Sequence, residues 1–120
     1  SSNSQNFVID IPERFHRERV LISLFFAKNS GIELDINCEQ QNKSQEMNVY
    51  LNKKASWSRS VIEIEEIKFG KLNITIDTEP VKTQNHWINP LGFSGRSERI
   101  IDVQGAYLLF IEIRHIGDEV

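Results

Sequence analysis

The sequence predicts an all-β domain, an antiparallel β-sandwich of Ig-like or jelly-roll-like form with about seven or eight strands. Several short segments alternate apolar and polar residues, which is the pattern of strands that bury one face. Gly, Asn, Ser and Pro separate these segments, and the chain lacks the regular alternation of strands and long helices that indicates a parallel α/β fold. The 120 residues are the length of one domain, so we expect a flexible polar leader at 1–6 and a single domain over 7–120.

Alternation with a period of two is clearest in residues 32–38 and 72–77, where Ile, Leu and Cys alternate with Glu, Asp, Asn and Thr. A strand that ends at Pro12 is expected first, because proline cannot donate to a β-ladder. The remaining expected strands are 47–51, 60–65, 100–103 and 106–114. The last of these is almost continuously apolar, which predicts a central strand covered on both faces.

Two connections are compatible with more than one local structure. The Phe69-Gly70-Lys71 step could turn the strand at 60–65 into the strand at 72–77 as a hairpin. Residues 12–19 could form a short helix with Pro12 at its first position. The segment from Val20 to Phe26 is rich in β-branched and aromatic residues and precedes an Asn-Ser-Gly turn, so we favour a strand there over a helix.

Charge and composition exclude several classes of protein. The formal net charge is −3, which is far from the basic surface that nucleic acid requires, so no nucleic-acid partner is expected. No apolar run is long enough for a transmembrane segment. The single cysteine, Cys38, lies on the apolar side of its strand and is expected to be a buried, inert thiol. The three histidines are widely separated, so neither a metal site nor a cofactor is expected.

The polar start of the sequence has neither a basic segment nor an apolar segment of a signal peptide. Such a start is typical of the mature end of an exported protein or of the tether of a lipid-anchored precursor. We therefore expect a periplasmic or cell-envelope protein, with a cytoplasmic protein as the alternative. An open sheet edge could also pair two copies of the chain as a homodimer.

No catalytic motif is visible in the sequence. The chain lacks the Gly-Xaa-Ser-Xaa-Gly elbow, the phosphate-binding loop and the dinucleotide glycine triplet. The densest carboxylate group comprises Glu63, Glu65 and Glu66, and two of these alternate with isoleucines on the solvent side of a strand. We expect a protein that is not an enzyme, and a small hydrolase remains the third hypothesis.

The connection from Glu79 to Ser97 is unusually long for a compact domain, and such loops are commonly functional. An indole in a polar segment offers a flat apolar face and a hydrogen-bond donor, which suits a sugar ring or a protein partner. Trp57 lies in a second polar segment, 53–59. The candidate binding residues are Asn85, His86, Trp87, Phe93 and Arg96 of the long connection, together with Trp57 and Arg59.

These residues support two binding hypotheses. The first is a small exported bacterial protein, similar in general form to immunity or inhibitor proteins, that recognises a protein partner through residues 80–96. The alternative is a carbohydrate-binding module that uses Trp57 and Trp87 to bind a glycan. Titration with soluble sugars would distinguish the two.

Overall fold

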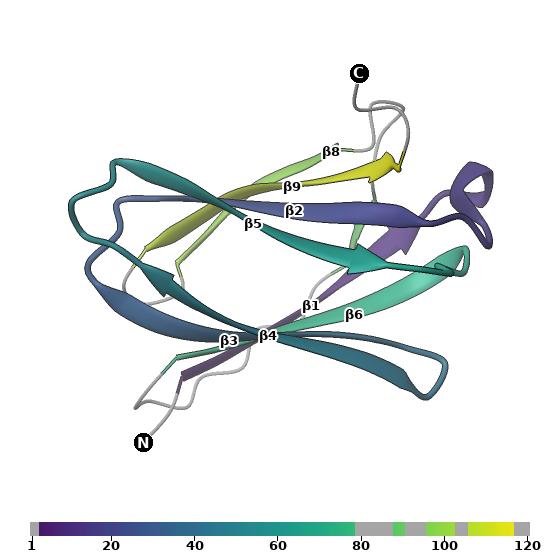
Figure 1. Ribbon diagram of the computed structural model, residues 1–120, viewed down its shortest axis with the longest axis horizontal. Helices are drawn as coiled ribbons and strands as arrows, with labels where there is room; N and C mark the ends of the chain where they lie inside the picture. The colour runs from purple at the N-terminus through teal and green to yellow at the C-terminus, as the bar shows by residue number, and fades with distance from the viewer. Residues whose placement is uncertain (1–2, 79–87, 91–95, 103–105, 117–120) are drawn as a thin grey trace.

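The computed structural model describes residues 3–78, 88–90, 96–102 and 106–116, which form two β-sheets packed face to face (Figure 1). The first sheet has the strand order β4-β3-β6-β1-β7, and the second has the order β5-β2-β9-β8. All neighbouring strands are antiparallel except β1 and β7. The predicted antiparallel β-sandwich is confirmed.

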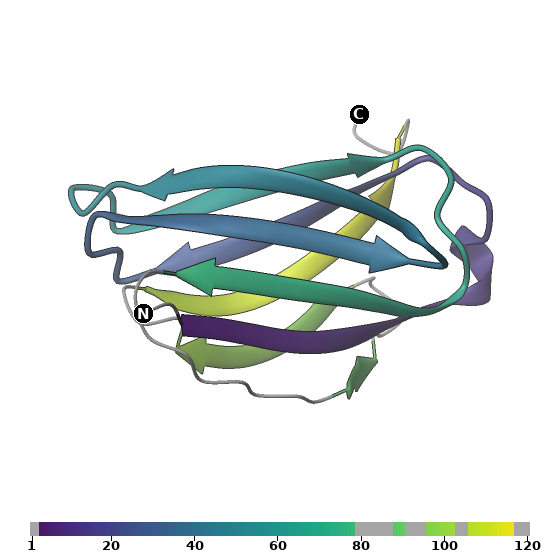
Figure 2. The same ribbon diagram turned by 90° about the horizontal axis from the view of Figure 1, so that it is seen from below.

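Most strands lie where the alternation of apolar residues placed them, and the very short β7 inside the expected long connection is an addition. The strands are β1 (Asn3–Ile11), β2 (Val20–Ala27), β3 (Ile32–Gln40), β4 (Lys43–Leu51), β5 (Trp57–Ile64), β6 (Gly70–Thr78), β7 (Ile88–Pro90), β8 (Arg96–Asp102) and β9 (Tyr107–His115). Figure 2 looks onto the first sheet, with β4 and β3 at one side and β1 and β7 at the other.

The structure corrects the expectation of a flexible polar leader at 1–6, because β1 already begins at Asn3. Every residue from Asn3 to Ile11 pairs with a residue of β6. Gln5 points into the sandwich and is only 4% exposed, although its side chain is polar. The backbone ladder with β6 therefore extends the strand into a segment whose side chains alone indicate a leader.

The ambiguous segment before β2 contains both of the elements that the sequence suggested. A 3-10 helix, η1, spans Glu13–Phe15 directly after Pro12, and Phe15 is buried beneath the end of the sandwich. The chain then enters β2, which confirms the strand expected from Val20 to Phe26. β2 pairs with β5 on one side and β9 on the other.

β3 and β4 form a hairpin whose two connecting residues, Gln41 and Asn42, have φ values of 46° and 65°. Positive φ at both central residues is the geometry that continues the right-handed twist of the paired strands.

The hairpin expected between 60–65 and 72–77 is wrong, because β5 and β6 belong to different sheets. Ile67, in the connection, is fully buried and caps the end of the core. Its backbone accepts a hydrogen bond from Arg17 N at 2.6 Å and donates one to Glu18 O at 3.1 Å. The β5–β6 connection, which crosses from one sheet to the other, is thus hydrogen-bonded to the segment after η1. Turn residues within the connection do not predict this long-range contact.

The core lies between the sheets and is built from the inward residues of β1, β2, β3, β6 and β9, with Ile62 of β5. Phe7, Leu24, Leu34 and Ile74 are all fully buried. β9 is a central strand with β2 and β8 on its two sides, but the expected cover on both faces is wrong, because the outward residue Phe110 is partly exposed and Arg114 is exposed. Within the described residues, no helix is long and apolar enough to cross a membrane.

Candidate functional site

The outer face of the β5-β2-β9-β8 sheet carries aromatic side chains, whereas the exposed face of a sheet usually carries polar ones. β2 alternates strictly, with Ile22, Leu24 and Phe26 in the core. Its outward residues are Leu21, Ser23, Phe25 and Ala27, which pair across to Glu63, Val61, Arg59 and Trp57 of β5. On the other side, Phe25 pairs with Phe110 of β9, and Ala27 pairs with Tyr107. Register therefore brings four aromatic residues from three strands to one face.

Three of these aromatic rings form a row across the strands, which we call the aromatic row: Trp57, Phe25 and Phe110. The ring centroids of Phe25 and Phe110 are 4.2 Å apart with an interplanar angle of 22°. The centroids of Phe25 and Trp57 are 6.5 Å apart with an angle of 24°. Nearly parallel neighbouring rings hold each other in position, so the row is a preformed surface.

Trp57 is the accessible end of the aromatic row. It is 61% exposed, whereas Phe25 and Phe110 are only partly exposed. β5 is the edge strand of its sheet, and Phe25 supports the indole from the β2 side. A large apolar ring held open to solvent on a rigid strand is a typical anchor for a ligand.

Arg59 lies beside the aromatic row, two residues along β5 from Trp57. Its Nε donates a hydrogen bond to Ser23 Oγ at 3.0 Å, and its guanidinium carbon lies 5.8 Å from the Phe25 ring centroid. Ser23 is 2% exposed, so this contact anchors the arginine to the sheet itself. The guanidinium is thus held next to the rings rather than free to sample many rotamers.

A second cation lies at the far side of the same face, where Lys28 Nζ is 5.4 Å from the ring centroid of Tyr107. The described acidic side chains of the face are engaged elsewhere. Glu63 binds Arg19 at 2.7 Å, and Glu112 binds Arg114 at 2.6 Å. The charge beside the aromatic row is therefore positive.

The structure unites two of the predicted binding residues and separates a third from them. Trp57 and Arg59 share one face, and Trp57 begins β5 instead of lying in a loop. Arg96 also belongs to a strand, because β8 begins there and pairs with β9. Its backbone partner is Glu112 of β9, so Arg96 lies on the edge strand opposite to β5 in this sheet.

The other predicted residues, Asn85, His86, Trp87 and Phe93, lie outside the described residues. Within the expected loop, 88–90 is a strand that pairs with β1. The recognition of a protein partner through residues 80–96 therefore stays a prediction.

Sequence reasoning missed Phe25, Phe110 and Tyr107 as site residues. Each belongs to a segment whose inward and outward positions are both apolar, so periodicity gives no sign of which residues face out. The sequence did contain one signal. A strand with one solvated face carries polar residues at every second position, and these strands carry apolar residues there instead.

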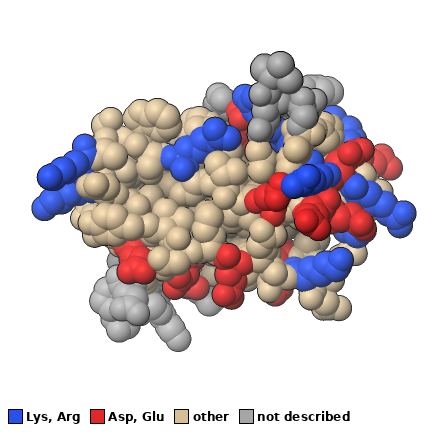
Figure 3. Space-filling model, in the orientation of Figure 1, with Lys and Arg blue, Asp and Glu red and all other residues tan. Residues whose placement is uncertain are grey.

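A cleft of about 760 Å³ lies at the open edge between the β3–β4 hairpin and the end of β5. Acidic and basic side chains gather at this end of the molecule, near the end of β5 on the right of Figure 3. The lining is mainly polar: Cys38, Gln40, Gln41, Lys43, Ser44, Gln45, Glu63, Ile64, Glu65, Glu66, Lys68 and Leu72.

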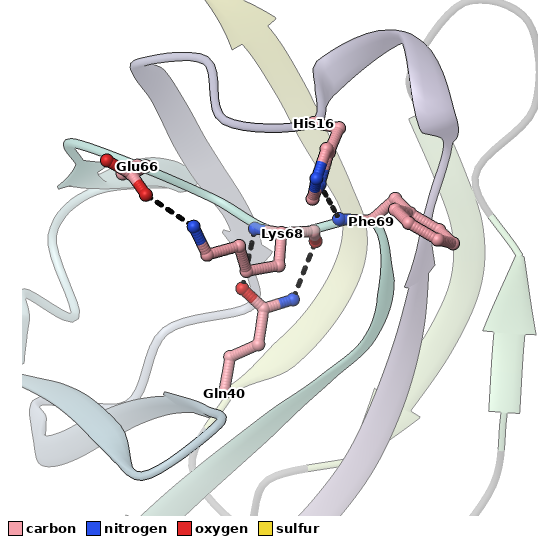
Figure 4. Close-up of polar contacts among 5 residues, drawn as sticks. All are labelled: His16, Gln40, Glu66, Lys68 and Phe69. Atoms are coloured by element: carbon pink, nitrogen blue, oxygen red, sulfur yellow. Dashed lines mark hydrogen bonds and ion pairs between the residues drawn. The ribbon is translucent and has the colours of Figure 1, made fainter.

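The polar contacts of this cleft hold the crossover in place (Figure 4). Gln40 Nε2 donates to Lys68 O at 2.7 Å, and Lys68 N donates to Gln40 Oε1 at 2.8 Å. Phe69 N donates to His16 Nδ1 at 3.1 Å. Lys68 also binds Glu66, and this hydrogen bond and charge lower the pKa of the Glu66 carboxyl. Gln40, Glu66 and Lys68 of the cleft are therefore engaged in contacts within the protein.

Neither a metal centre nor a reactive thiol emerges from the described residues. Among them, no three His, Cys, Asp or Glu side chains are grouped so that they could hold a metal ion. Cys38 is 3% exposed, and burial raises the pKa of its thiol to about 12. The thiol stays protonated at neutral pH, as expected for a packing residue.

Comparison with known proteins gives a match of fold. No protein-family model matches the chain, and no curated protein matches it significantly. Among solved structures, the chain is similar to TmCBM61, a carbohydrate-binding module solved in complex with β-1,4-galactotriose. The similarity has a TM-score of 0.50 at 9% identity and covers 92% of this chain. The chain spans about 60% of that protein's length. The two proteins thus share a β-sandwich fold.

Proposed function

We propose that this domain binds a polysaccharide on the outer face of the β5-β2-β9-β8 sheet, with Trp57 as its main contact. The observation that carries the proposal is the aromatic row, in which Phe25 and Phe110 support an indole that is 61% exposed. A pyranose ring has one face made of C–H bonds, and that face packs against an aromatic ring while its hydroxyls stay in water. The fold similarity to a carbohydrate-binding module supports the same function.

We propose binding without catalysis. Glycoside hydrolysis needs one carboxylic acid that keeps its proton near neutral pH, which requires a raised pKa. Lys68 has the opposite effect on Glu66, and Glu63 is paired with Arg19. These contacts support a structural role for Glu63 and Glu66.

Affinity electrophoresis against a panel of neutral and acidic polysaccharides, β-1,4-galactan among them, tests the proposal. The mobility of the protein should fall with at least one polysaccharide. Trp57→Ala should weaken that interaction by about tenfold or more, because the anchor of the site is lost. Its melting temperature should change little, since the indole is mostly in solvent.

Tyr50→Ala is the matched control. Tyr50 is 62% exposed, but it lies on β4, where it pairs with Glu33 on the outer face of the other sheet. Removal of this equally exposed ring should leave binding unchanged. Equal losses in the two variants, or no retardation by any polysaccharide, would contradict the proposal.

A further inference from the structure

We infer that the polysaccharide is acidic: Arg59 receives the carboxylate of a uronic acid whose ring packs on Trp57. This inference rests on the proposed function and adds the chemical class of the ligand. It comes from the charge beside the aromatic row rather than from the rings, which would accept a neutral sugar equally well.

The position of Arg59 is set by the sheet. Ser23 Oγ accepts the hydrogen bond from Nε at 3.0 Å, and the guanidinium lies 5.8 Å from the Phe25 ring centroid. Within the described residues, the N–H groups on the two terminal nitrogens have no other partner, and they form the planar fork that matches a carboxylate. No described acidic side chain is hydrogen-bonded or ion-paired to Arg59.

The spacing suits one sugar residue. Trp57 and Arg59 are two positions apart on one strand face, which places their Cα atoms about 7 Å apart. An equatorial carboxylate of a uronic acid lies close to the plane of its ring. A sugar packed on the indole can therefore extend its carboxylate along β5 toward the guanidinium.

The neighbouring charges favour an anion at this position. Glu63, the acidic residue further along β5, is already bound to Arg19 at 2.7 Å. Lys28 adds a positive charge near Tyr107 on the same face. Among the described side chains of this face, no carboxylate is paired with Arg59, the cation two positions from Trp57 along β5.

The test compares polygalacturonate with the same polymer after full methyl esterification, which removes the charge and keeps the chain. Dissociation constants are measured by calorimetry at about 20 mM and about 200 mM NaCl. The acidic form should bind the protein about tenfold more tightly at the lower salt concentration, and the preference should shrink at the higher one.

Arg59→Gln should abolish the preference for the acidic polymer while retaining binding of the esterified one. Arg59→Lys keeps the charge but not the fork, so it should retain only part of the preference. Lys71→Gln removes a positive charge from β6, where Lys71 is exposed on the outer face of the other sheet, and should leave the preference intact. A melting curve for each variant establishes that it is folded.

The outcomes separate the two proposals. Equal binding of both polymers by the unaltered protein, or an unchanged preference in Arg59→Gln, overturns the assignment of a uronic acid and leaves polysaccharide binding intact. Tighter binding of a sulfated galactan than of polygalacturonate overturns the carboxylate as the recognised anion. Failure to bind every polysaccharide in the panel overturns the proposed function itself.

Discussion

The outer faces of the two sheets differ sharply, although both sheets cover the same core. On the β4-β3-β6-β1-β7 sheet, the outward row across β1, β6 and β3 reads Asn6, Thr75 and Asn37. The next row places Asp77 beside Asp35, and Asn48 of β4 donates to Asp35 Oδ1 at 2.8 Å. These side chains are polar, in contrast to the rings on the other sheet, although Asn6 and Asn37 are only partly exposed and their Oδ1 atoms are buried.

The corresponding row on the β5-β2-β9-β8 sheet consists of Trp57, Phe25 and Phe110 with Arg59 beside them. Burial in the core does not require these rings, because they lie on the outer side of the sheet. An apolar face left open to water lowers solubility, so its presence indicates a ligand or partner. The comparison thus supports the proposed binding on the outer face of the β5-β2-β9-β8 sheet.

The largest expected effect comes from the core that both faces share. Ile74 is fully buried on β6, and its neighbour Thr75 points to the polar face. Ile74→Ala should lower the free energy of unfolding by about 2–5 kcal/mol, because it removes packing and leaves a cavity. Thr75→Ala on the same strand should cost less than about 1 kcal/mol. Urea denaturation measures both, and a costlier Thr75 variant would show that the polar face also contributes to stability.

Phe25→Ala tests whether the aromatic row acts as a unit. Phe25 is partly exposed, so the loss of stability should be about 2 kcal/mol, roughly half of the value for a fully buried ring. Binding to the polysaccharide that retards the protein should weaken about tenfold, because Trp57 loses its supporting ring. Denaturation and affinity electrophoresis on the same sample measure the two effects. Unchanged binding would mean that Trp57 acts alone.

The sequence predicts the fold well because strand alternation is a local property. Residues 32–38 and 72–77 alternate cleanly and became β3 and β6. Whether two successive strands pair depends on contacts between residues far apart in the sequence. The sequence therefore could not predict that the connection through Ile67 crosses from one sheet to the other. That residue is fixed by Arg17 and Glu18, which lie about fifty positions earlier in the chain.

Of the candidate site, the sequence indicated only what stands out from its surroundings. Trp57 was identified as an indole in a polar segment that also contains Arg59, whereas Phe25 and Phe110 lie within apolar runs. Ser58 and Ser60 lie on the inner side of β5, where apolar residues are usual, so the first residues of this strand were interpreted as part of a polar segment. Cross-strand register, which no single segment encodes, is what brings the four residues together.

The smallest expected effect tests the comparison from the polar side. Asp35 and Asp77 are directly opposite each other on neighbouring strands, and like charges in that arrangement are destabilising. Asp77→Asn should therefore raise the free energy of unfolding by about 0.2–1 kcal/mol at low salt, and the gain should fade as salt screens the pair. Binding of the polysaccharide should not change, since the substitution lies on the outer face of the opposite sheet. Weaker binding in this variant would show that the acidic face also contacts the ligand, and the division between a binding face and a solvated face would fail.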